Sequence, residues 1–289
     1  MVRTLSRMKT SPTILGTHFV VRSARRAGKR IGLVPTMGAL HEGHLSLVRA
    51  AKAQTDLVVV SIFVNPLQFG PQEDLAKYPR MFERDCELLE REGVDLVFAP
   101  STAEMYPPGA ITLVEVKDLT DRLDGVSRPG HFRGVTTVVA KLFHIVEPDV
   151  AFFGQKDSAQ SAIIRKMVKD LNFAVEIVVC PIVRESDGLA MSSRNAYLNA
   201  EQRQQGLVLS RALRKVGQLF EAGERDVERL AAAGKEVMTA QPAAKLDYLS
   251  IVDPDTLEPV QQAGGPMLVA VAAWIGSTRL IDNVILRPE

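Results

Sequence analysis

The sequence predicts an α/β protein with a doubly wound parallel sheet, followed by a smaller α+β domain. Up to about residue 180, short runs of apolar, β-branched residues alternate with longer amphipathic segments. Such alternation is typical of parallel strands that are covered by helices on both faces, as in a Rossmann-like fold. After Arg184 the pattern changes to a polar loop, two helices and three strands. We therefore expect one domain over residues 1–183 and a second over 184–289.

Length and composition agree with this prediction. The 289 residues are enough for two domains of ~150 residues each. An apolar fraction of 46% and a charged fraction of 24% are ordinary for a globular protein. The net charge of +1 provides no overall field that would attract nucleic acid or an anionic membrane.

Three further features concern the cellular compartment. Cys86 and Cys180 are far apart and form no CxxC pair, which argues against a disulfide framework or a thiolate metal site. The first residues lack the apolar core of a signal peptide. The longest apolar run, Met267–Ile275, is far shorter than the ~20 residues of a membrane helix. We expect a cytoplasmic, soluble protein that binds neither nucleic acid nor membrane.

Five strands are expected in the first domain, at residues 31–37, 56–64, 95–100, 149–154 and 175–183. The segments between them show helical spacing of apolar residues, notably after His44 and over residues 80–93, 133–146 and 157–171. Ligands of doubly wound sheets bind beyond the carboxyl ends of the strands. The residues that follow each strand are therefore the candidates for a site.

The second domain begins with a helix signal. Asn199 is a predicted N-cap with Gln202 three positions later, which is a capping-box pattern. Helices are expected at about 200–222 and 226–240, and strands at 245–252, 266–275 and 278–286. Gly276-Ser277 between the last two strands indicates a hairpin.

The stretch "LVPTMGALHEGH" leads from the first strong strand into a helix. The free N–H groups and the positive dipole end of a helix N-terminus favour an anion, and Gly38 allows the backbone to approach it closely. His41 and His44 are three residues apart and project from one side of the first turn, where they could donate to a phosphate chain. A zinc site or a pair of surface histidines are the alternatives. Zinc needs a third ligand, and the sequence has no second His/Cys cluster.

Amide and cationic side chains follow two other strands. Asn65 and Gln68 follow strand 56–64, where amides can bind a small hydroxy acid without adding charge, although Asn65-Pro66 alone is also typical of a turn. Lys156 follows strand 149–154 and is expected to face phosphate, with Asp157 as a helix cap and Gln160 facing the acid substrate. Elsewhere, a lone lysine at a helix start is usually a solvated charge.

The polar loop after the domain boundary contains two hydroxyls and a guanidinium in succession, at Ser192, Ser193 and Arg194. Such a loop can close over a triphosphate and hold it. A loop that only caps a helix is the alternative.

Five motifs stand out along the chain: "PTMGALHEGH" (35–44), "FVNPLQF" (63–69), "DLAKYPR" (74–80), "FGQKD" (153–157) and "MSSRN" (191–195). In this order they resemble the pantoate–β-alanine ligase family of the HxGH-type nucleotidyltransferase superfamily. The C-terminal part also agrees in length and pattern. The resemblance implies an ATP- and Mg²⁺-dependent ligase that is a homodimer. It would condense pantoate with β-alanine through pantoyl adenylate and release AMP and pyrophosphate.

The resemblance also implies site residues. His44, His41 and Lys156 would be catalytic, pantoate would contact Gln68, Gln160 and Asn65, and β-alanine would contact Gln68. The first domain would bind ATP and pantoate, and the second would close over the site. The residues implied for ATP are Met37, Gly38, Ala39, Leu40, His41, Glu42, Gly43, His44, Gly154, Gln155, Lys156, Asp157, Val183, Met191, Ser192, Ser193 and Arg194.

Three further segments bear on the substrate cavity and on magnesium. The family places His131 and Arg133 near the substrate cavity. Ser158 and Ala159 depart from the family pattern and are expected to support the site. After Tyr78-Pro79-Arg80 only Glu83 and Asp85 remain acidic, so no magnesium ligand is assigned and Mg²⁺ is expected on ATP phosphates and water.

Two other functions stay open from the residues alone. One is a nucleotidyltransferase that adds AMP to a phosphorylated acceptor and stops there. The other is a non-catalytic nucleotide-binding regulatory domain. A ligase releases AMP only when acid and amine are both present, a nucleotidyltransferase releases none, and a regulatory domain binds ATP without releasing pyrophosphate.

Overall fold

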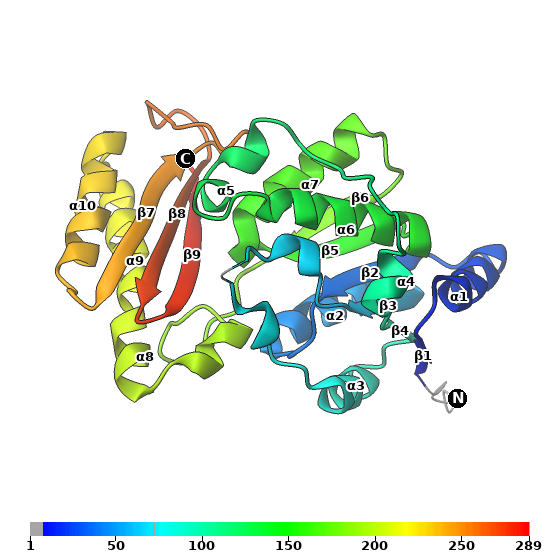
Figure 1. Ribbon diagram of the computed structural model, residues 1–289. Coiled ribbons are helices and arrows are strands. Elements are labelled where there is room, and N and C mark those ends of the chain that lie inside the picture. The colour runs from blue at the N-terminus through cyan, green and yellow to red at the C-terminus, as the bar shows by residue number, and fades with distance from the viewer. Residues whose placement is uncertain (1–7, 72, 289) are drawn as a thin grey trace, which may run out of the picture. The chain divides into compact units, whose positions relative to one another are not determined.

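A computed structural model describes residues 8–71 and 73–288 (Figure 1). The chain divides into two compact units. The first unit consists of Met1–Thr120, Pro129–Gly154 and Ile163–Cys180, and the second of Asp121–Arg128, Gln155–Ala162 and Pro181–Glu289. Two short segments from the N-terminal half and the middle of the chain thus group with its C-terminal part.

A six-stranded parallel sheet forms the centre of the first unit, which confirms the predicted doubly wound fold. The strands follow the order β1-β4-β3-β2-β5-β6, so the direction of winding reverses between β2 and β5. Ligands bind at such a switch point. The strands are β1 (Lys9–Ser11), β2 (Ile31–Thr36), β3 (Leu57–Ile62), β4 (Leu96–Phe98), β5 (Val150–Gly154) and β6 (Glu176–Cys180).

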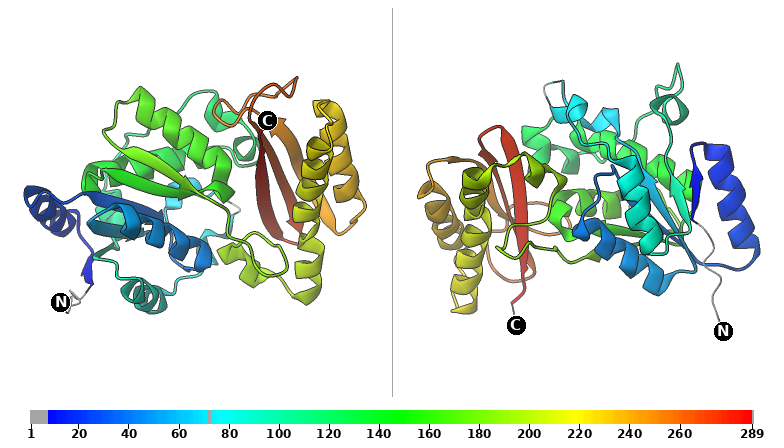
Figure 2. Two further views of the ribbon diagram at one scale, coloured as in Figure 1. Left: turned by 180° about the vertical axis from the view of Figure 1, so that it is seen from behind. Right: turned by 90° about the horizontal axis from the view of Figure 1, so that it is seen from below.

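Helices cover both faces of this sheet. Helices α2 (Glu42–Gln54) and α3 (Phe82–Arg91) pack on one face, which Figure 2 shows from behind. Helices α1 (Ile14–Arg26) and α6 (His131–Val146) pack on the other. Helix α7 (Ser158–Asp170) joins β5 to β6, and α4 (Thr102–Met105) follows β4. The strands are buried from both sides, which explains why they are continuous apolar runs.

The second unit contains an antiparallel sheet of β7 (Ala244–Val252), β8 (Met267–Ile275) and β9 (Thr278–Leu286). Helices α9 (Val208–Glu221) and α10 (Val227–Thr239) pack on this sheet through a shared apolar core. The unit also includes the short helix α5 (Asp124–Ser127). The predicted α+β character and the hairpin between the last two strands are confirmed.

Two predictions about elements were incomplete. The helix expected over 200–222 is two helices, α8 (Ala200–Gly206) and α9, because the helix is interrupted at Gly206-Leu207 and glycine is a weak helix former. The capping box of Asn199 with Gln202 is confirmed. Strand β1 and helix α1 were not anticipated.

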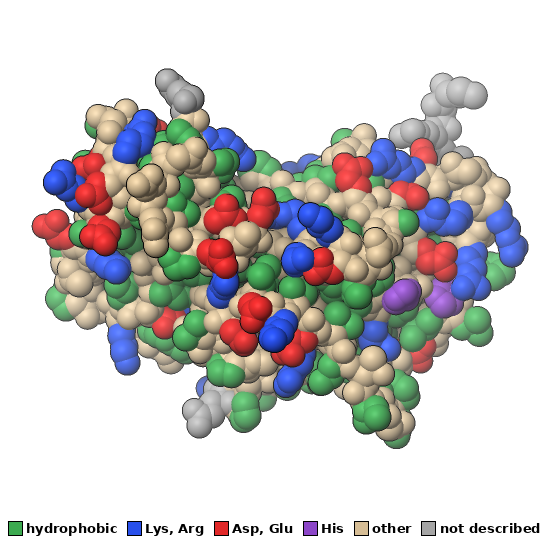
Figure 3. Space-filling view, turned by 90° about the horizontal axis from the view of Figure 1, so that it is seen from above, with side chains coloured by type: hydrophobic (Ala, Val, Ile, Leu, Met, Phe, Trp, Pro, Cys, Tyr) green, Lys and Arg blue, Asp and Glu red, His purple; other side chains and the backbone are tan. Residues whose placement is uncertain are grey.

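Among residues 8–71 and 73–288, no helix is long and apolar enough to span a bilayer. Lys and Arg side chains are interspersed with Asp and Glu on the face in Figure 3.

Candidate active site

His41 and His44 form the N-terminal cap of α2. His41 is the N-cap residue, and its Nδ1 accepts the backbone N–H of Gly43 at 3.1 Å. His44 Nδ1 accepts the backbone N–H of His41 at 3.3 Å, and the ring centroids are 4.1 Å apart. A nitrogen that accepts a hydrogen bond carries no proton, so the proton of each neutral ring is on Nε2. The cap thus fixes the tautomer in which Nε2 is a hydrogen-bond donor.

The turn before this cap is held by a buried carboxylate. Asp85 of α3 is fully buried, and its Oδ2 and Oδ1 accept the backbone N–H groups of Ala39 and Leu40, both at 2.8 Å. Gly38 and Ala39 both have positive φ angles, +81° and +50°, which costs energy for alanine. Burial raises the pKa of Asp85, whereas the two N–H groups oppose that shift. Asp85 therefore stabilises the unusual backbone of the turn.

Asn65 and Gln68 lie after β3, as predicted, on the 3-10 turn η1 (Pro66–Gln68) and its N-cap. Asn65 is buried and uses all four of its amide hydrogen-bonding positions. Its Nδ2 donates to Gln68 Oε1 at 3.1 Å and to the carbonyl of Gly134 at 3.0 Å. Its Oδ1 accepts from the Leu67 N–H at 3.3 Å and from the Tyr106 hydroxyl at 2.8 Å. Burial raises the pKa of Tyr106, which keeps its hydroxyl a donor.

Helix α6 holds the same turn from another side. His131 Nδ1 lies 2.8 Å from the backbone oxygen of Gln68. A Cβ atom on Gly134 would lie 2.2 Å from the carbonyl oxygen of Leu67, so only glycine permits this approach of helix and turn. With its backbone fixed, Gln68 directs its Nε2 to the thioether of Met37, at 3.3 Å. The structure therefore brings two predicted site residues, Met37 and Gln68, into contact.

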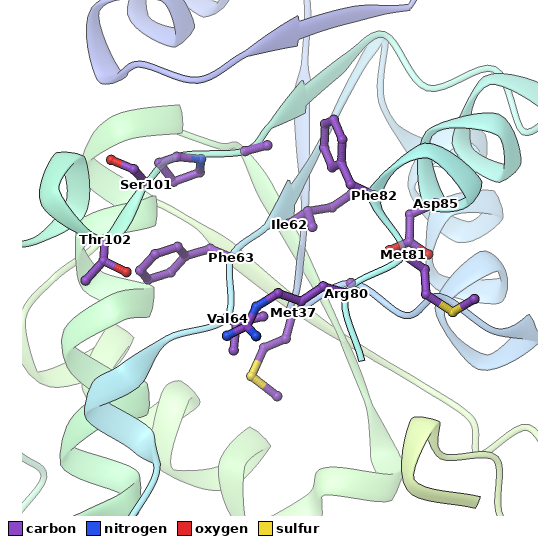
Figure 4. A pocket seen from close by; sticks show the side chains of 13 residues that line it. Met37, Ile62, Phe63, Val64, Arg80, Met81, Phe82, Asp85, Ser101 and Thr102 are labelled. Atoms are coloured by element: carbon purple, nitrogen blue, oxygen red, sulfur yellow. The ribbon is translucent and has the colours of Figure 1, made fainter. Parts of the chain in front are cut away.

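A pocket of about 320 Å³ opens at the carboxyl ends of β2, β3 and β4 (Figure 4). Its wall is mostly apolar, and the Arg80 side chain is its cationic element. The lining residues are Met37, Gly38, Ile62, Phe63, Val64, Arg80, Met81, Phe82, Asp85, Ala99, Pro100, Ser101 and Thr102.

The second unit carries the predicted residues around Lys156. Gln155–Asp157 form the turn η4 directly before α7, and Lys156 Nζ lies 3.5 Å from Asp157 Oδ1. Gln160 is half-buried in the first turns of α7. Ser158 and Ala159 are buried.

The loop with the two serines and Arg194 is built on a small hairpin. The Met191 N–H donates to the carbonyl of Val183 at 3.0 Å, and Arg184 pairs with Ala190. Ser192 then caps the turn η5 (Ser193–Tyr197), with its hydroxyl accepting the Arg194 N–H at 3.3 Å. The capping role considered for this loop is thus present.

Two more observations bear on metal binding. Among the residues described, no group of three or more His, Cys, Asp or Glu side chains is placed to hold a metal ion. Glu83 is exposed on α3, whereas both carboxylate oxygens of Asp85 are bonded to backbone N–H groups.

Sequence reasoning missed the residues that orient the site. From the sequence, Asp85 draws attention only as an acidic residue after Tyr78-Pro79-Arg80, and Tyr106 and Gly134 are not predicted to belong to the site. An aspartate in a charged helix and a glycine inside a helix are the local signals, but neither identifies its partner.

Comparison with known proteins gives consistent results. The family model described as pantoate-beta-alanine ligase matches residues 9–285. A curated pantothenate synthetase of Acidobacterium capsulatum is 65% identical over 97% of this chain and 91% of that protein. A relative from Koribacter versatilis with the same name is 62% identical over 97% of this chain and 96% of its own.

Solved structures agree in fold over nearly the whole chain. A pantothenate synthetase from Thermus thermophilus superposes with a TM-score of 0.93 at 47% identity, covering 97% of this chain and 100% of that one. A pantoate-beta-alanine ligase from Francisella tularensis, complexed with beta-gamma ATP and beta-alanine, has a TM-score of 0.75 at 35% identity and covers 96% of this chain and 97% of that one. This chain belongs to the pantoate–β-alanine ligase family.

Proposed function

We propose that this ligase joins pantoate to β-alanine in two steps that share one bound intermediate. A carboxylate oxygen of pantoate attacks the α-phosphorus of ATP, and pyrophosphate leaves with the electrons of the broken P–O bond. The amine of β-alanine then attacks the acyl carbon, loses a proton, and expels AMP. The carboxylate is itself the nucleophile, so the protein contributes positioning and charge stabilisation.

The observation that supports this chemistry most is the double histidine cap. Because both Nδ1 atoms accept backbone N–H groups, His41 and His44 are proposed to donate from Nε2 to the phosphate oxygens. Lys156, Ser192, Ser193 and Arg194 are proposed as further phosphate ligands. The remaining ATP contacts are proposed for the backbone and side chains of Met37, Gly38, Ala39, Leu40, Glu42, Gly43, Gly154, Gln155, Asp157, Val183 and Met191. The proposal includes closure of the chain on ATP, because the residues proposed as its ligands belong to both units.

Pantoate is proposed to bind Gln68 and Gln160, and β-alanine to bind near Gln68. A thioether is a weak acceptor, so a hydroxyl or carboxylate of pantoate would replace Met37 Sδ as the partner of Gln68 Nε2. Asn65 has no free hydrogen-bonding position. We therefore assign Asn65 the role of orienting Gln68, and the direct contact of Asn65 with pantoate stays a prediction.

Magnesium is proposed to enter as MgATP. Mg²⁺ keeps several waters and commonly takes one or two carboxylates together with substrate phosphates. The described residues include no group of three or more His, Cys, Asp or Glu side chains that could hold a metal ion, and both oxygens of Asp85 are bonded to the turn. This donor set fits an ion carried by the phosphates. When bound, Mg²⁺ would offset phosphate charge during adenylation.

A homodimer is also proposed, as is a cytoplasmic location. The first unit exposes Ile111 by 90% and Leu113 by 49% on a segment outside the helices and strands, and large apolar side chains of this exposure suit an interface between subunits. The two cysteines are free thiols, which suits a reducing compartment.

The test measures pyrophosphate and AMP separately while acid and amine are varied. We expect pyrophosphate with ATP and pantoate, and AMP only when β-alanine is added. Pyrophosphate release with a phosphorylated acceptor and no AMP would indicate a nucleotidyltransferase. ATP binding without pyrophosphate under any condition would indicate a regulatory domain.

A further inference from the structure

Asn283 in β9 is directed at the turn that carries Lys156. The residue is 2% exposed, and its Nδ2 donates to the backbone oxygens of Gln155 at 3.0 Å and of Lys156 at 2.9 Å. Its Oδ1 accepts from Gln155 Nε2 at 3.0 Å. Among side chains, a neutral amide can supply two donors and an acceptor together in this space. Asn283 therefore fixes the backbone from which the Lys156 side chain projects.

The preceding residue, Asp282, is directed at a different segment. Its side chain is 3% exposed and accepts two hydrogen bonds from the Arg184 guanidinium, at 2.6 and 2.9 Å. Arg184 also donates to the carbonyl of Gly188 at 3.1 Å, within the hairpin that leads to Met191. A bidentate carboxylate–guanidinium pair fixes orientation as well as distance.

Successive residues of a strand point to opposite sides, so one dipeptide can hold two separate segments. We infer that Asp282 and Asn283 are positioning residues for ATP. Asn283 sets the Lys156 turn, and Asp282 sets the base of the loop with Ser192, Ser193 and Arg194. The inference rests on the proposed function, because it takes those residues as phosphate ligands.

Hydrogen exchange of the ligand-free protein tests the two halves separately. Asn283→Asp removes both donors and places negative charge against two carbonyl oxygens, so exchange over residues 155–160 should rise about tenfold or more. Asp282→Asn should instead raise exchange over residues 184–195. Leu286→Ala in the same strand, buried in the core of the unit, is the control for general loss of stability. Asn199→Asp is the control for the chemical change, because aspartate also caps a helix.

Kinetics distinguish positioning from stability. A misplaced Lys156 should raise the KM for ATP and lower kcat by about 10- to 100-fold, with the KM for pantoate changed less than about twofold. A neutral carboxylic acid regains one donor, so the relative activity of Asn283→Asp should increase as the pH is lowered from about 8 to about 6. Asn283→Ser keeps one donor without the charge, and it serves if Asn283→Asp does not fold. Asn283→Ser should show a smaller loss of kcat than Asn283→Asp and no recovery of activity at lower pH.

The inference is overturned if folded Asn283 variants leave exchange at 155–160 and the KM for ATP as they are in Leu286→Ala. It is also overturned if the two substitutions affect both segments equally. Exchange needs no turnover, so a wild-type protein that forms no AMP would refute the proposed function and leave this readout intact.

Discussion

The backbone N–H of His41 donates to Nδ1 of His44, one turn further along α2. The same two residues are proposed to bind phosphate, and the bond orients the His44 ring relative to the helix. Each ring is held by the backbone at one nitrogen, which leaves the other nitrogen with the proton.

His44→Ala should reduce pyrophosphate release more than it reduces stability. Loss of a donor to the developing phosphate charge should cost on the order of 3 kcal/mol of transition-state stabilisation. Loss of the cap should cost about 1 kcal/mol of unfolding free energy. His44→Asn is the matched control. The asparagine Oδ1 can accept the His41 N–H in place of Nδ1, whereas the shorter side chain cannot reach the position of Nε2. If His44→Asn restores adenylation together with stability, His44 acts only as a cap.

Gln68→Ala should impair the use of pantoate and leave ATP affinity nearly unchanged. The side chain lies on η1, after β3, and contacts Met37 from there. We expect the KM for pantoate to rise about 10-fold, the usual size of a lost hydrogen bond to a charged group. An equal loss of ATP affinity, measured by calorimetry, would show that Gln68 is wrongly assigned to pantoate.

Gly134→Ala should damage the same turn without touching a polar side chain. Its Cβ would overlap the Leu67 carbonyl, and backbone cannot move aside as a side chain can. We expect a loss of about 1–3 kcal/mol of unfolding free energy and a raised KM for pantoate. A Cβ atom on Gly217 in α9 would meet nothing within 4 Å, so Gly217→Ala should raise the free energy of unfolding by about 0.5–1 kcal/mol. Similar effects of the two substitutions would contradict the close approach of α6 and η1.

Asp85→Asn should weaken the turn and change the pH dependence of stability. The folded-state pKa of Asp85 is raised, so protonation of Asp85 stabilises the folded state. This contribution is fully present when the pH is below the ordinary pKa of aspartate. That contribution is lost as the pH rises through the folded pKa. The stability of wild type relative to Asp85→Asn should therefore fall as the pH rises from about 4 upward. Glu83→Gln on the same helix is the control, because Glu83 is exposed and should show no such trend.

At neutral pH, Asp85→Asn should still destabilise by about 1–3 kcal/mol, because an amide NH₂ would face a backbone N–H. It should also lower the adenylation rate through the displaced turn. A variant with wild-type kcat and an unchanged pH dependence of stability would show that Asp85 does not hold the turn.

Ile111→Asp should convert a dimer to a monomer. A charge on a side chain that is 90% exposed costs little in a monomer but opposes burial at an interface. Sedimentation velocity measures the change, and Val126→Asp, 69% exposed in the second unit, is the control. A wild-type protein that sediments as a monomer would refute the proposed dimer.

The sequence by itself determined the fold class and the places where chemistry is expected. Continuous apolar strands and helical spacing follow from local periodicity, and the cap at Asn199 follows from bonds across three residues. The carboxyl ends of β2, β3 and β5 could be located because each motif directly follows its strand. Strand β1 was missed because three residues give too little periodicity.

Only the tertiary structure decided how the candidate residues are held. Asp85 bonds to Ala39, Asn65 to Gly134, and Asn283 to Lys156, in each case between elements far apart in the chain. Nothing local distinguishes Asn65 as a substrate ligand from Asn65 as a saturated support. The difference depends on whether packing brings Tyr106 and Gly134 within hydrogen-bond distance, because a buried amide takes every partner that the fold provides.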